Sequence, residues 1–198
     1  MSCDLLLIGV GGQGVLTIGG ILIDAATAAG VPASLYPTKG MAQRGGSVKV
    51  ELRLGRDGVG PHLPERGADV VVSMERSETL RAVRIVKPGG DVLLYDHVWE
   101  PTAVMLGDAS YPALDAVAEQ VGLAEAGLVT LDPTSRPRVD GVPVVANVFV
   151  LGAAVGLPAL RGILEPAGVR EILERRWPRA AEANAAAFDA GLRAVEDA

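Results

Sequence analysis

The apolar positions at the start of the chain form one continuous run, residues 3–9 (CDLLLIG), that ends in glycines. A short apolar run bounded by turn residues is typical of a buried strand. Residues 14–29 have a different pattern, in which apolar side chains recur at helical spacing and stop before Gly30. These side chains are Leu16, Ile18, Ile21, Leu22 and Ala25. The pattern therefore predicts a strand, a glycine turn and a helix, in that order.

Strands and helices continue to alternate along the rest of the chain. The further predicted strands cover residues 32–37, 47–55, 69–74, 91–96 and 128–132, and the further predicted helices cover 75–87, 111–122, 145–157, 169–177 and 179–195. Such alternation is typical of an α/β fold: a doubly wound, Rossmann-like sheet with helices on both faces, here with a helical C-terminal tail. Only about ten residues separate the second and third strands, too few for a helical crossover. We therefore expect that pair to be antiparallel in a mixed, mostly parallel sheet.

Length and composition narrow the class of protein. We expect the 198 residues to form a single domain, residues 1–198, and 49% hydrophobic with 21% charged residues is a globular balance. The net charge of −6 disfavours a nucleic-acid binder, whose binding face is normally basic. The apolar runs are too short for a membrane span, and the N-terminus lacks a signal-peptide pattern. We expect a cytoplasmic protein with no membrane partner.

Metal-binding residues are scarce. Cys3 is the only cysteine, so the chain cannot form an internal disulfide or supply the ligands of an iron–sulfur cluster. His62 and His97 are isolated, and we expect no metal site. If the protein takes part in redox chemistry, the metal is expected in another chain.

The glycine turn admits two interpretations. Gly9, Gly11 and Gly14 have the G-x-G-x-x-G spacing that brings a backbone close to a dinucleotide phosphate. That function also needs an acidic residue at the end of the second strand, where this chain has SLYPTKG. The other interpretation is a tight turn with close helix–sheet packing, which Gly19 and Gly20 within the helix favour. A stand-alone NAD(P)-binding oxidoreductase stays an alternative.

A second distinctive stretch, residues 37–48 (PTKGMAQRGGSV), combines cations, an amide and glycines. Its polar and glycine residues are Lys39, Gly40, Gln43, Arg44, Gly45 and Gly46. An arginine between glycines can present its planar guanidinium to a carboxylate or a phosphate of a substrate or partner. The alternative is a solvated basic turn.

The predicted topology gathers polar segments at one edge of the sheet. Ligands of open α/β sheets bind beyond the carboxyl ends of the strands. Residues 11–14, residues 39–44, Glu75 and the pair Asp96–His97 all follow predicted strands. Glu75 could instead complement a helix dipole. Together the segments predict a site or an interface at this edge.

Five segments carry a resemblance to a known family. They are GVGGQGVLTIGGIL, KGMAQRGGSV, SMERSETLR, NVFVLGA and NAAAFDAG. In sequence, order and spacing they resemble the gamma subunit or domain of 2-oxoacid:ferredoxin oxidoreductases, the pyruvate and ketoisovalerate enzymes among them. The likeness is greatest to the smaller, beta subunit of indolepyruvate oxidoreductases. It extends from residue 5 to about residue 191.

The resemblance implies a subunit that is inactive alone. Such complexes oxidatively decarboxylate a 2-oxoacid to an acyl-CoA and pass electrons to ferredoxin. Thiamine diphosphate, Mg²⁺ and the iron–sulfur clusters would belong to the large partner subunit, CoA would enter the complex, and this chain alone would bind none of them. The resemblance leaves open which 2-oxoacid is the substrate. A non-enzymatic anion- or nucleotide-binding module stays a further alternative.

The resemblance also selects site residues that would face the active site or an interface. The turn is formed by Gly11, Gly12, Gln13 and Gly14, and the facing loop by Gln43, Arg44, Gly45 and Gly46, with Lys39, Glu75 and Asn147 added from the same segments. No residue is assigned as catalytic, because the chain has no recognisable Ser/His/Asp or Cys/His set. The alanine-rich tail face, made by Ala180, Ala183, Ala187 and Leu192, predicts a close approach of another helix or subunit, and a homo-oligomer when the chain is isolated.

Overall fold

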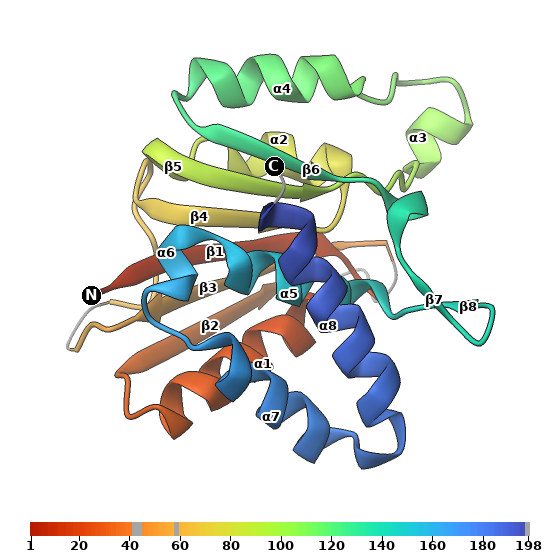
Figure 1. Cartoon of the computed structure of the whole chain (residues 1–198). Coiled ribbons are helices and arrows are strands. Elements are labelled where there is room, and N and C mark those ends of the chain that lie inside the picture. The colour runs from red at the N-terminus through yellow and green to blue at the C-terminus, as the bar shows by residue number, and fades with distance from the viewer. Residues whose placement is uncertain (41–44, 58–59, 197–198) are drawn as a thin grey trace.

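The computed structural model describes residues 1–40, 45–57 and 60–196. A six-stranded sheet in the order β2-β3-β1-β4-β5-β6 runs through the molecule between two layers of helices (Figure 1). The strands are β1 (Cys3–Val10), β2 (Ala33–Lys39), β3 (Ser47–Leu54), β4 (Ala68–Ser73), β5 (Val86–Tyr95) and β6 (Gly127–Leu131). The longer helices are α1 (Val15–Ala28), α2 (Arg76–Ala82), α4 (Leu114–Leu123), α5 (Ala146–Gly156), α7 (Pro166–Arg176) and α8 (Ala181–Glu196). The predicted fold class is confirmed.

The strand directions explain why polar segments meet at one edge. β1, β4, β5 and β6 pair in parallel, whereas β3 is antiparallel to both β1 and β2, which confirms the expected antiparallel pair. β2 therefore runs in the same direction as β1. Val10 at the end of β1 pairs with Ser47, and Lys39 at the end of β2 pairs with Val48. The ends of β1, β2, β4 and β5 thus share an edge with the start of β3, as the sequence predicted.

Helices α1, α5, α7 and α8 cover one face of the sheet. The core beneath them joins apolar side chains of β1, β3 and β4 to those of the helices, with Phe149 and Phe188 among the largest. Gly19 of α1 approaches Leu35 and Val50 as closely as the packing interpretation requires. Gly20 points into open space, so the same expectation for that residue is wrong.

The alanine-rich tail face meets a helix of the same chain. A side chain on Gly191 of α8 would collide with the Phe149 carbonyl of α5, and one on Gly152 of α5 would collide with the Phe188 carbonyl of α8. Ala187 is fully buried in this helix pair, and Ala180 is the exposed one among the four residues named for that face. The expected close approach is confirmed for a helix, α5, while contact with another subunit stays a prediction.

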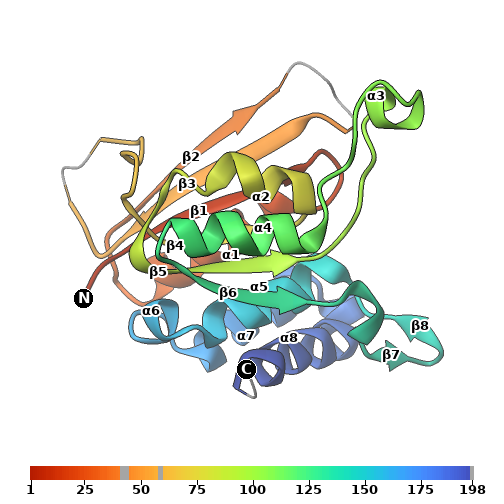
Figure 2. The ribbon, with the colours of Figure 1, turned by 90° about the horizontal axis from the view of Figure 1, so that it is seen from above.

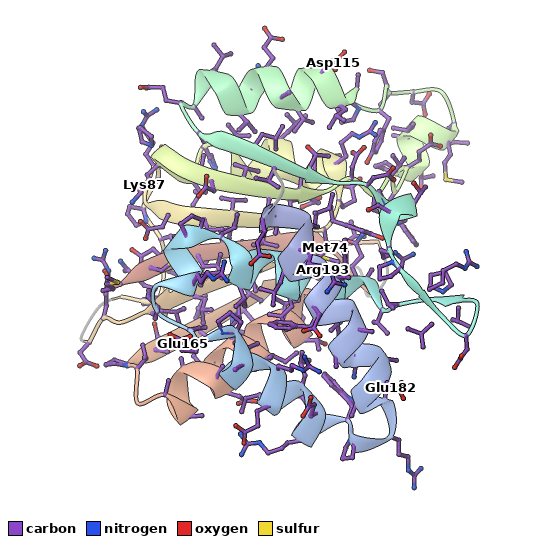
Figure 3. The ribbon with its side chains drawn as sticks, in the orientation of Figure 1. Met74, Lys87, Asp115, Glu165, Glu182 and Arg193 are labelled. Carbon is purple, nitrogen blue, oxygen red and sulfur yellow. The ribbon has the colours of Figure 1, made fainter. Side chains whose placement is uncertain are left out.

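Helices α2 and α4 cover the opposite face over β1, β4, β5 and β6 (Figure 2). Val71, Val92, Val117 and Val121 form the centre of this second core. Charged side chains such as Asp115 and Glu182 lie at the periphery, whereas Met74 at the end of β4 is buried (Figure 3). Met74 lies directly next to the edge where the polar segments meet.

Three predicted helix boundaries are wrong by three residues or more, and a proline lies near each. The helix predicted to begin at residue 169 begins at Pro166, since proline fits the first turn of a helix. The helix predicted at 75–87 ends at Ala82, and residues 86–95 form β5, which is longer than the predicted 91–96. Pro88 disfavours helical backbone at the residue before it, and Val83, Ile85 and Val86 are β-branched. The helix predicted at 111–122 begins at Leu114, because Pro112 keeps the backbone before it extended.

The sequence did not predict four shorter elements and two single 3₁₀ turns. They are α3 (Thr102–Met105), α6 (Pro158–Arg161), the hairpin of β7 (Arg138–Val139) and β8 (Val142–Pro143), and the 3₁₀ turns Pro133–Ser135 and Pro178–Ala180. The hairpin turns at Asp140 and Gly141, both with positive φ, and it projects from the end of the molecule at which β6 ends (Figure 1). Among the described residues, no helix has the length and apolar character to cross a membrane.

Candidate functional site

The glycine turn between β1 and α1 is fixed in place by the side chain of Gln13. Its Oε1 accepts a hydrogen bond from the Val10 N–H at 2.8 Å, and its Nε2 donates to the Met74 carbonyl at 2.7 Å. Both polar atoms of this side chain are therefore used within the chain. Gln13 ties the end of β1 to the end of β4 and leaves the backbone of the turn, rather than its own amide, to face outward.

Gly14 is the residue on which the turn and helix α1 depend. Its φ of 82° lies in the left-handed region, and a Cβ at this position would collide with the side-chain amide of Asn147. Asn147 belongs to the first turn of α5, so the predicted site residue from the NVFVLGA segment does meet the glycine turn. Among the described residues, Asn147 Oδ1 is buried without a hydrogen-bond partner.

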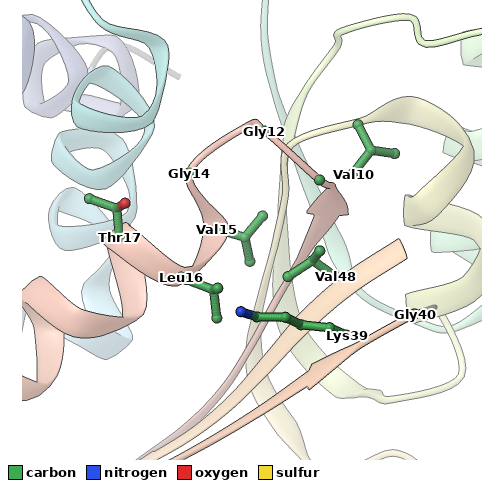
Figure 4. Close-up of a pocket in the computed structure, with 10 residues that line it drawn as sticks. Val10, Gly12, Gly14, Val15, Leu16, Thr17, Lys39, Gly40 and Val48 are labelled. Atoms are coloured by element: carbon green, nitrogen blue, oxygen red, sulfur yellow. The ribbon is translucent and has the colours of Figure 1, made fainter. Parts of the chain in front are cut away.

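The start of α1 lines a cavity of about 670 Å³ (Figure 4). Gly11, Gly12 and Gly14 lie on one side of it, and Lys39 with Gly40 on the other. Gly14 offers no side-chain cap and the first turn of α1 has no acidic residue, so the unpaired N–H groups of that turn carry uncompensated partial positive charge. Together with the Lys39 ammonium, this arrangement favours an anionic group.

The loop before β3 is bonded directly to the glycine turn. The Gly11 N–H donates to the Gly46 carbonyl at 2.9 Å, and the Gly40 N–H donates to the Ser47 carbonyl at 3.0 Å. Gly45, with φ of 69°, lies against the indole of Trp99. The structure thus brings Gly11, Gly45 and Gly46 together, as the sequence predicted. Gln43 and Arg44 lie outside the described residues.

Glu75 is fully buried and does more than complement a helix dipole. It is the N-cap of α2: its Oε2 accepts from the Glu78 N–H at 2.9 Å and from Ser77 Oγ at 2.7 Å. Its Oε1 accepts from the Trp99 N–H at 3.3 Å and from the Tyr111 hydroxyl. Burial and the adjacent Glu75 raise the pKa of Tyr111 to about 12.

An ion pair lies next to Glu75 at the end of β5. Arg76 donates two hydrogen bonds to Asp96, at 2.6 and 2.8 Å, and the contact raises the pKa of the Arg76 guanidinium. The Arg76 N–H also donates to the His97 carbonyl at 3.0 Å. Asp96 and His97 therefore lie at the predicted edge, and the Asp96 carboxylate is already paired with Arg76 of the same chain.

Trp99 and Tyr111 are site residues that the sequence analysis missed. Trp99 is nearly half exposed and lines a second cavity, of about 760 Å³, together with Gly45, Val98 and Met105. Both residues lie between β5 and α4, outside the short helix α3, and Tyr111 was predicted only as the first residue of a helix. For Trp99 the available signal was an aromatic residue in a polar segment shortly beyond a strand, and no such signal marks Tyr111.

The described residues do not fit an iron–sulfur cluster or a metal site. Cys3 is completely buried, and burial, followed by the nearby Asp69 and Asp4, raises the pKa of its thiol to about 12. No group of three potential ligands from histidine, cysteine, aspartate and glutamate side chains occurs within the ranges 1–40, 45–57 and 60–196. The sequence contains a single cysteine, so this chain alone cannot supply the thiolate ligands of the iron–sulfur clusters that the resemblance implies.

Comparison with known proteins identifies the family. Residues 4–194 match the pyruvate ferredoxin/flavodoxin oxidoreductase family. The chain belongs to this family, and the resemblance seen in the sequence is confirmed.

The related sequences are subunits of one kind of enzyme. The chain is 33% identical over 196 residues to the indolepyruvate oxidoreductase subunit IorB of Pyrococcus horikoshii, covering 98% of this chain and 96% of that protein. It is 34% identical over 174 residues to IorB of Archaeoglobus fulgidus, covering 88% and 84%. The similarity therefore extends over most or nearly all of the length of both aligned sequences in each comparison.

Solved structures share the fold at lower identity. Pyruvate oxidoreductase subunit PORC of Thermotoga maritima superposes with a TM-score of 0.72 at 20% identity, covering 97% of this chain and 96% of that one. The gamma subunit of a keto/oxoacid ferredoxin oxidoreductase of Geobacter sulfurreducens gives 0.70 at 22%, covering 99% of both. The 2-oxoglutarate:ferredoxin oxidoreductase of Magnetococcus marinus gives 0.65 at 15%, where the chain covers only 31% of a longer protein.

Proposed function

We propose that this chain is the small subunit of a thiamine-diphosphate-dependent 2-oxoacid:ferredoxin oxidoreductase of the indolepyruvate type. The observation that carries the proposal is the 33% identity to a subunit of indolepyruvate oxidoreductase over 98% of this chain. The site supports it, because the polar groups collect at one sheet edge and, among the described residues, include no nucleophile and base that could act alone. The complex would convert a 2-oxoacid into an acyl-CoA and transfer electrons to ferredoxin.

The large partner subunit would supply the reacting groups. Bound in that subunit, thiamine diphosphate with Mg²⁺ would supply an electron sink for decarboxylation, and iron–sulfur clusters would supply the route for electrons to ferredoxin. The role of this chain is to shape and close the site. The glycine turn, held by Gln13, and the loop at Gly45 and Gly46 present main-chain groups at the edge. Gln43 and Arg44 lie outside the described residues, and in this proposal they would act at the interface with the partner, as the resemblance implies.

An anionic part of a substrate or cofactor fits the start of α1. The free N–H groups there and the Lys39 ammonium favour a carboxylate or phosphate, and both occur among the reactants of the proposed reaction. Asn147, whose side-chain Nδ2 lies against Gly14 and whose Oδ1 is buried without a partner among the described residues, would orient the first turn of α1. The chain contributes binding and orientation, which can lower a reaction barrier substantially without any covalent step.

Reconstitution tests the proposal directly. The chain is co-expressed with the large subunit encoded in the native host, and the complex is purified. Reduction of a viologen dye is then measured in the presence of thiamine diphosphate, Mg²⁺ and CoA. The substrates are indolepyruvate, other aryl pyruvates, branched-chain 2-oxoacids and 2-oxoglutarate. We expect one class of 2-oxoacid to be oxidised by the complex and none by this chain alone. Oxidation by the isolated chain, or by the large subunit without it at the full rate, would contradict the proposal.

A second candidate function is an anion- or nucleotide-binding module without chemistry of its own. The cavity at the start of α1 favours it, since this cavity could bind a phosphate in the absence of any partner. The two candidates separate in calorimetry. Micromolar binding of NADH or another nucleotide to the isolated chain would favour the module, whereas weak or no binding favours the subunit, because the chain has no acidic residue at the end of β2 for the ribose.

A further inference from the structure

Residues 97–112 leave the sheet after β5 and return to it at the start of α4. Four of the exposed large hydrophobic side chains belong to this segment, namely Val98, Trp99, Met105 and Leu106. A segment with so few buried side chains is expected to open easily. Both of its ends are nevertheless bonded to the start of α2.

Glu75 bonds to this segment with one oxygen and to its own helix with the other. Oε2 caps α2 through the Glu78 N–H and the Ser77 hydroxyl. Oε1 is left for the Trp99 N–H near the first end of the segment and the Tyr111 hydroxyl near the second. A helix cap needs only one acceptor oxygen, so the second oxygen has a separate task.

Arg76 bonds to the same two ends. It holds Asp96 through two hydrogen bonds, and its N–H donates to the His97 carbonyl. Its Nη1 lies 3.4 Å from the Pro112 carbonyl oxygen, at the far end of the segment. Successive residues of α2 therefore fix the positions where the segment leaves and returns.

Trp99 connects this segment to the candidate site by direct contact. A Cβ placed on Gly45 would lie 3.0 Å from the Trp99 Nε1 atom, so the indole and the loop are in direct contact. The next residue, Gly46, accepts the hydrogen bond from the Gly11 N–H at 2.9 Å. A continuous set of contacts thus leads from Glu75 through Trp99 and the 45–46 loop to the glycine turn.

We propose that Glu75 and Tyr111 form a latch that holds Trp99 against the 45–46 loop and thereby positions the glycine turn for the reaction of the complex. They are positioning residues, since neither lies among the residues that line the cavity at the start of α1. Burial and the adjacent Glu75 raise the pKa of Tyr111 to about 12. The hydroxyl is therefore protonated, and able to donate, at physiological pH. The effect on the reaction rests on the proposed function, whereas the latch itself does not.

Hydrogen exchange of the full chain, followed by mass spectrometry, tests the latch. Tyr111→Phe removes the donor and keeps the ring. We expect peptides covering residues 97–106, 45–50 and 10–15 to exchange about tenfold faster or more, since losing one buried hydrogen bond shifts a local opening by about that factor. Tyr36→Phe is the matched control, because Tyr36 is partly exposed on β2 and its hydroxyl makes no hydrogen bond within the described residues; it should leave these peptides unchanged. An effect of Tyr111→Phe confined to residues 97–112 would overturn the transmission to the turn.

Glu75→Asp separates the latch from the helix cap. Aspartate caps helices well, but its shorter side chain cannot both cap α2 and reach Tyr111 and Trp99. We expect Glu75→Asp to retain the exchange protection of α2 while residues 97–106 and 10–15 lose theirs. Unchanged protection of residues 97–106 would show that Glu75 is only a cap, and equal loss in α2 would show that the segment opens with the helix; either result would overturn the latch.

Turnover of the reconstituted complex tests the positioning role. At saturating large subunit, we expect Tyr111→Phe to lower kcat about fivefold or more while the midpoint of the subunit titration moves less than about twofold, as expected when groups are misplaced rather than unbound. Unchanged kcat together with faster exchange would overturn the role in the reaction. A wild-type complex that oxidises no 2-oxoacid would refute the proposed function, and the exchange data would still decide on the latch.

Discussion

Replacement of Gly14 by alanine probes the contact on which the glycine turn depends. Gly14 has φ of 82°, where an L-residue costs about 1–2 kcal/mol relative to glycine. The new Cβ would also collide with the side-chain amide of Asn147, and such overpacking commonly costs a further 1–3 kcal/mol or so. We therefore expect Gly14→Ala to destabilise the chain by roughly 2–5 kcal/mol.

Two companion variants divide this cost into its parts. Gly12→Ala is the matched control, because Gly12 also has positive φ, 103°, but nothing lies within 4 Å of its Cβ position. It should lose only the backbone part, about 1–2 kcal/mol. Asn147→Ala removes the obstructing amide and leaves only the Cβ of residue 147, 3.1 Å from the new Cβ, so Gly14→Ala in that background should lose the backbone part and little more. The two sites should thus show a coupling energy of about 1–3 kcal/mol.

Urea unfolding of the isolated chain measures all four variants. With an m-value of about 2–3 kcal/mol per molar for a chain of this size, a loss of 3 kcal/mol or so lowers the midpoint by about 1 M or more. The reasoning would be refuted if Gly14→Ala cost no more than Gly12→Ala. It would also be refuted if the Asn147→Ala background left the cost of Gly14→Ala unchanged, since the collision would then contribute nothing.

The remaining predictions concern the loop, the thiol and the isolated chain. Arg44→Ala should change the free energy of unfolding by less than about 0.5 kcal/mol yet lower the turnover of the complex about tenfold or more, as loss of a charge paired across an interface does; normal turnover would restore the solvated-turn interpretation. Because the pKa of Cys3 is raised to about 12 from an ordinary value of 9.0, its contribution to stability is complete below pH 9 and is lost as pH rises toward 12. The unfolding free energy of wild type should therefore fall more steeply above pH 9 than that of Cys3→Ala, by up to about 1.4 kcal/mol per pH unit, and parallel curves would contradict this. The purified chain should contain no iron or flavin by elemental analysis and absorption. It should also self-associate in light scattering, because Met105 and Leu106 are largely exposed; a strict monomer would argue against an apolar interface there.

The sequence predicts the strands well because their signal is local. Buried strands such as β1 and β4 are uninterrupted apolar runs, and their ends are marked by glycine or by polar residues. The predicted helix boundaries near Pro88 and Pro112 are wrong because the apolar periodicity continues across residues at which the following proline disfavours helical backbone. The short distance between the second and third strands was enough to predict their antiparallel pairing.

The candidate site was only partly predictable. The direction of a side chain and the group it bonds to depend on residues that are distant in the sequence. Topology alone placed Gly11, Lys39 and Glu75 at one edge, since the ends of parallel strands share an edge. It could not show that Gln13 turns back to bond Met74, a residue 61 positions away in sequence. Nor could it show that Tyr111 reaches Glu75 across an irregular segment, since no local pattern records that contact.

The G-x-G-x-x-G spacing is ambiguous for a physical reason. The spacing indicates a backbone that turns sharply after a strand and enters a helix with no side chains obstructing the turn. Both a dinucleotide site and a subunit interface need such an open turn. What distinguishes them is the surroundings of the turn. Here the turn is bonded to the 45–46 loop and pressed against Asn147, and the end of β2 carries Lys39 where a dinucleotide site has an acid. A turn held from two sides by its own chain, with a cation at its mouth, suits an edge that is completed by another protein.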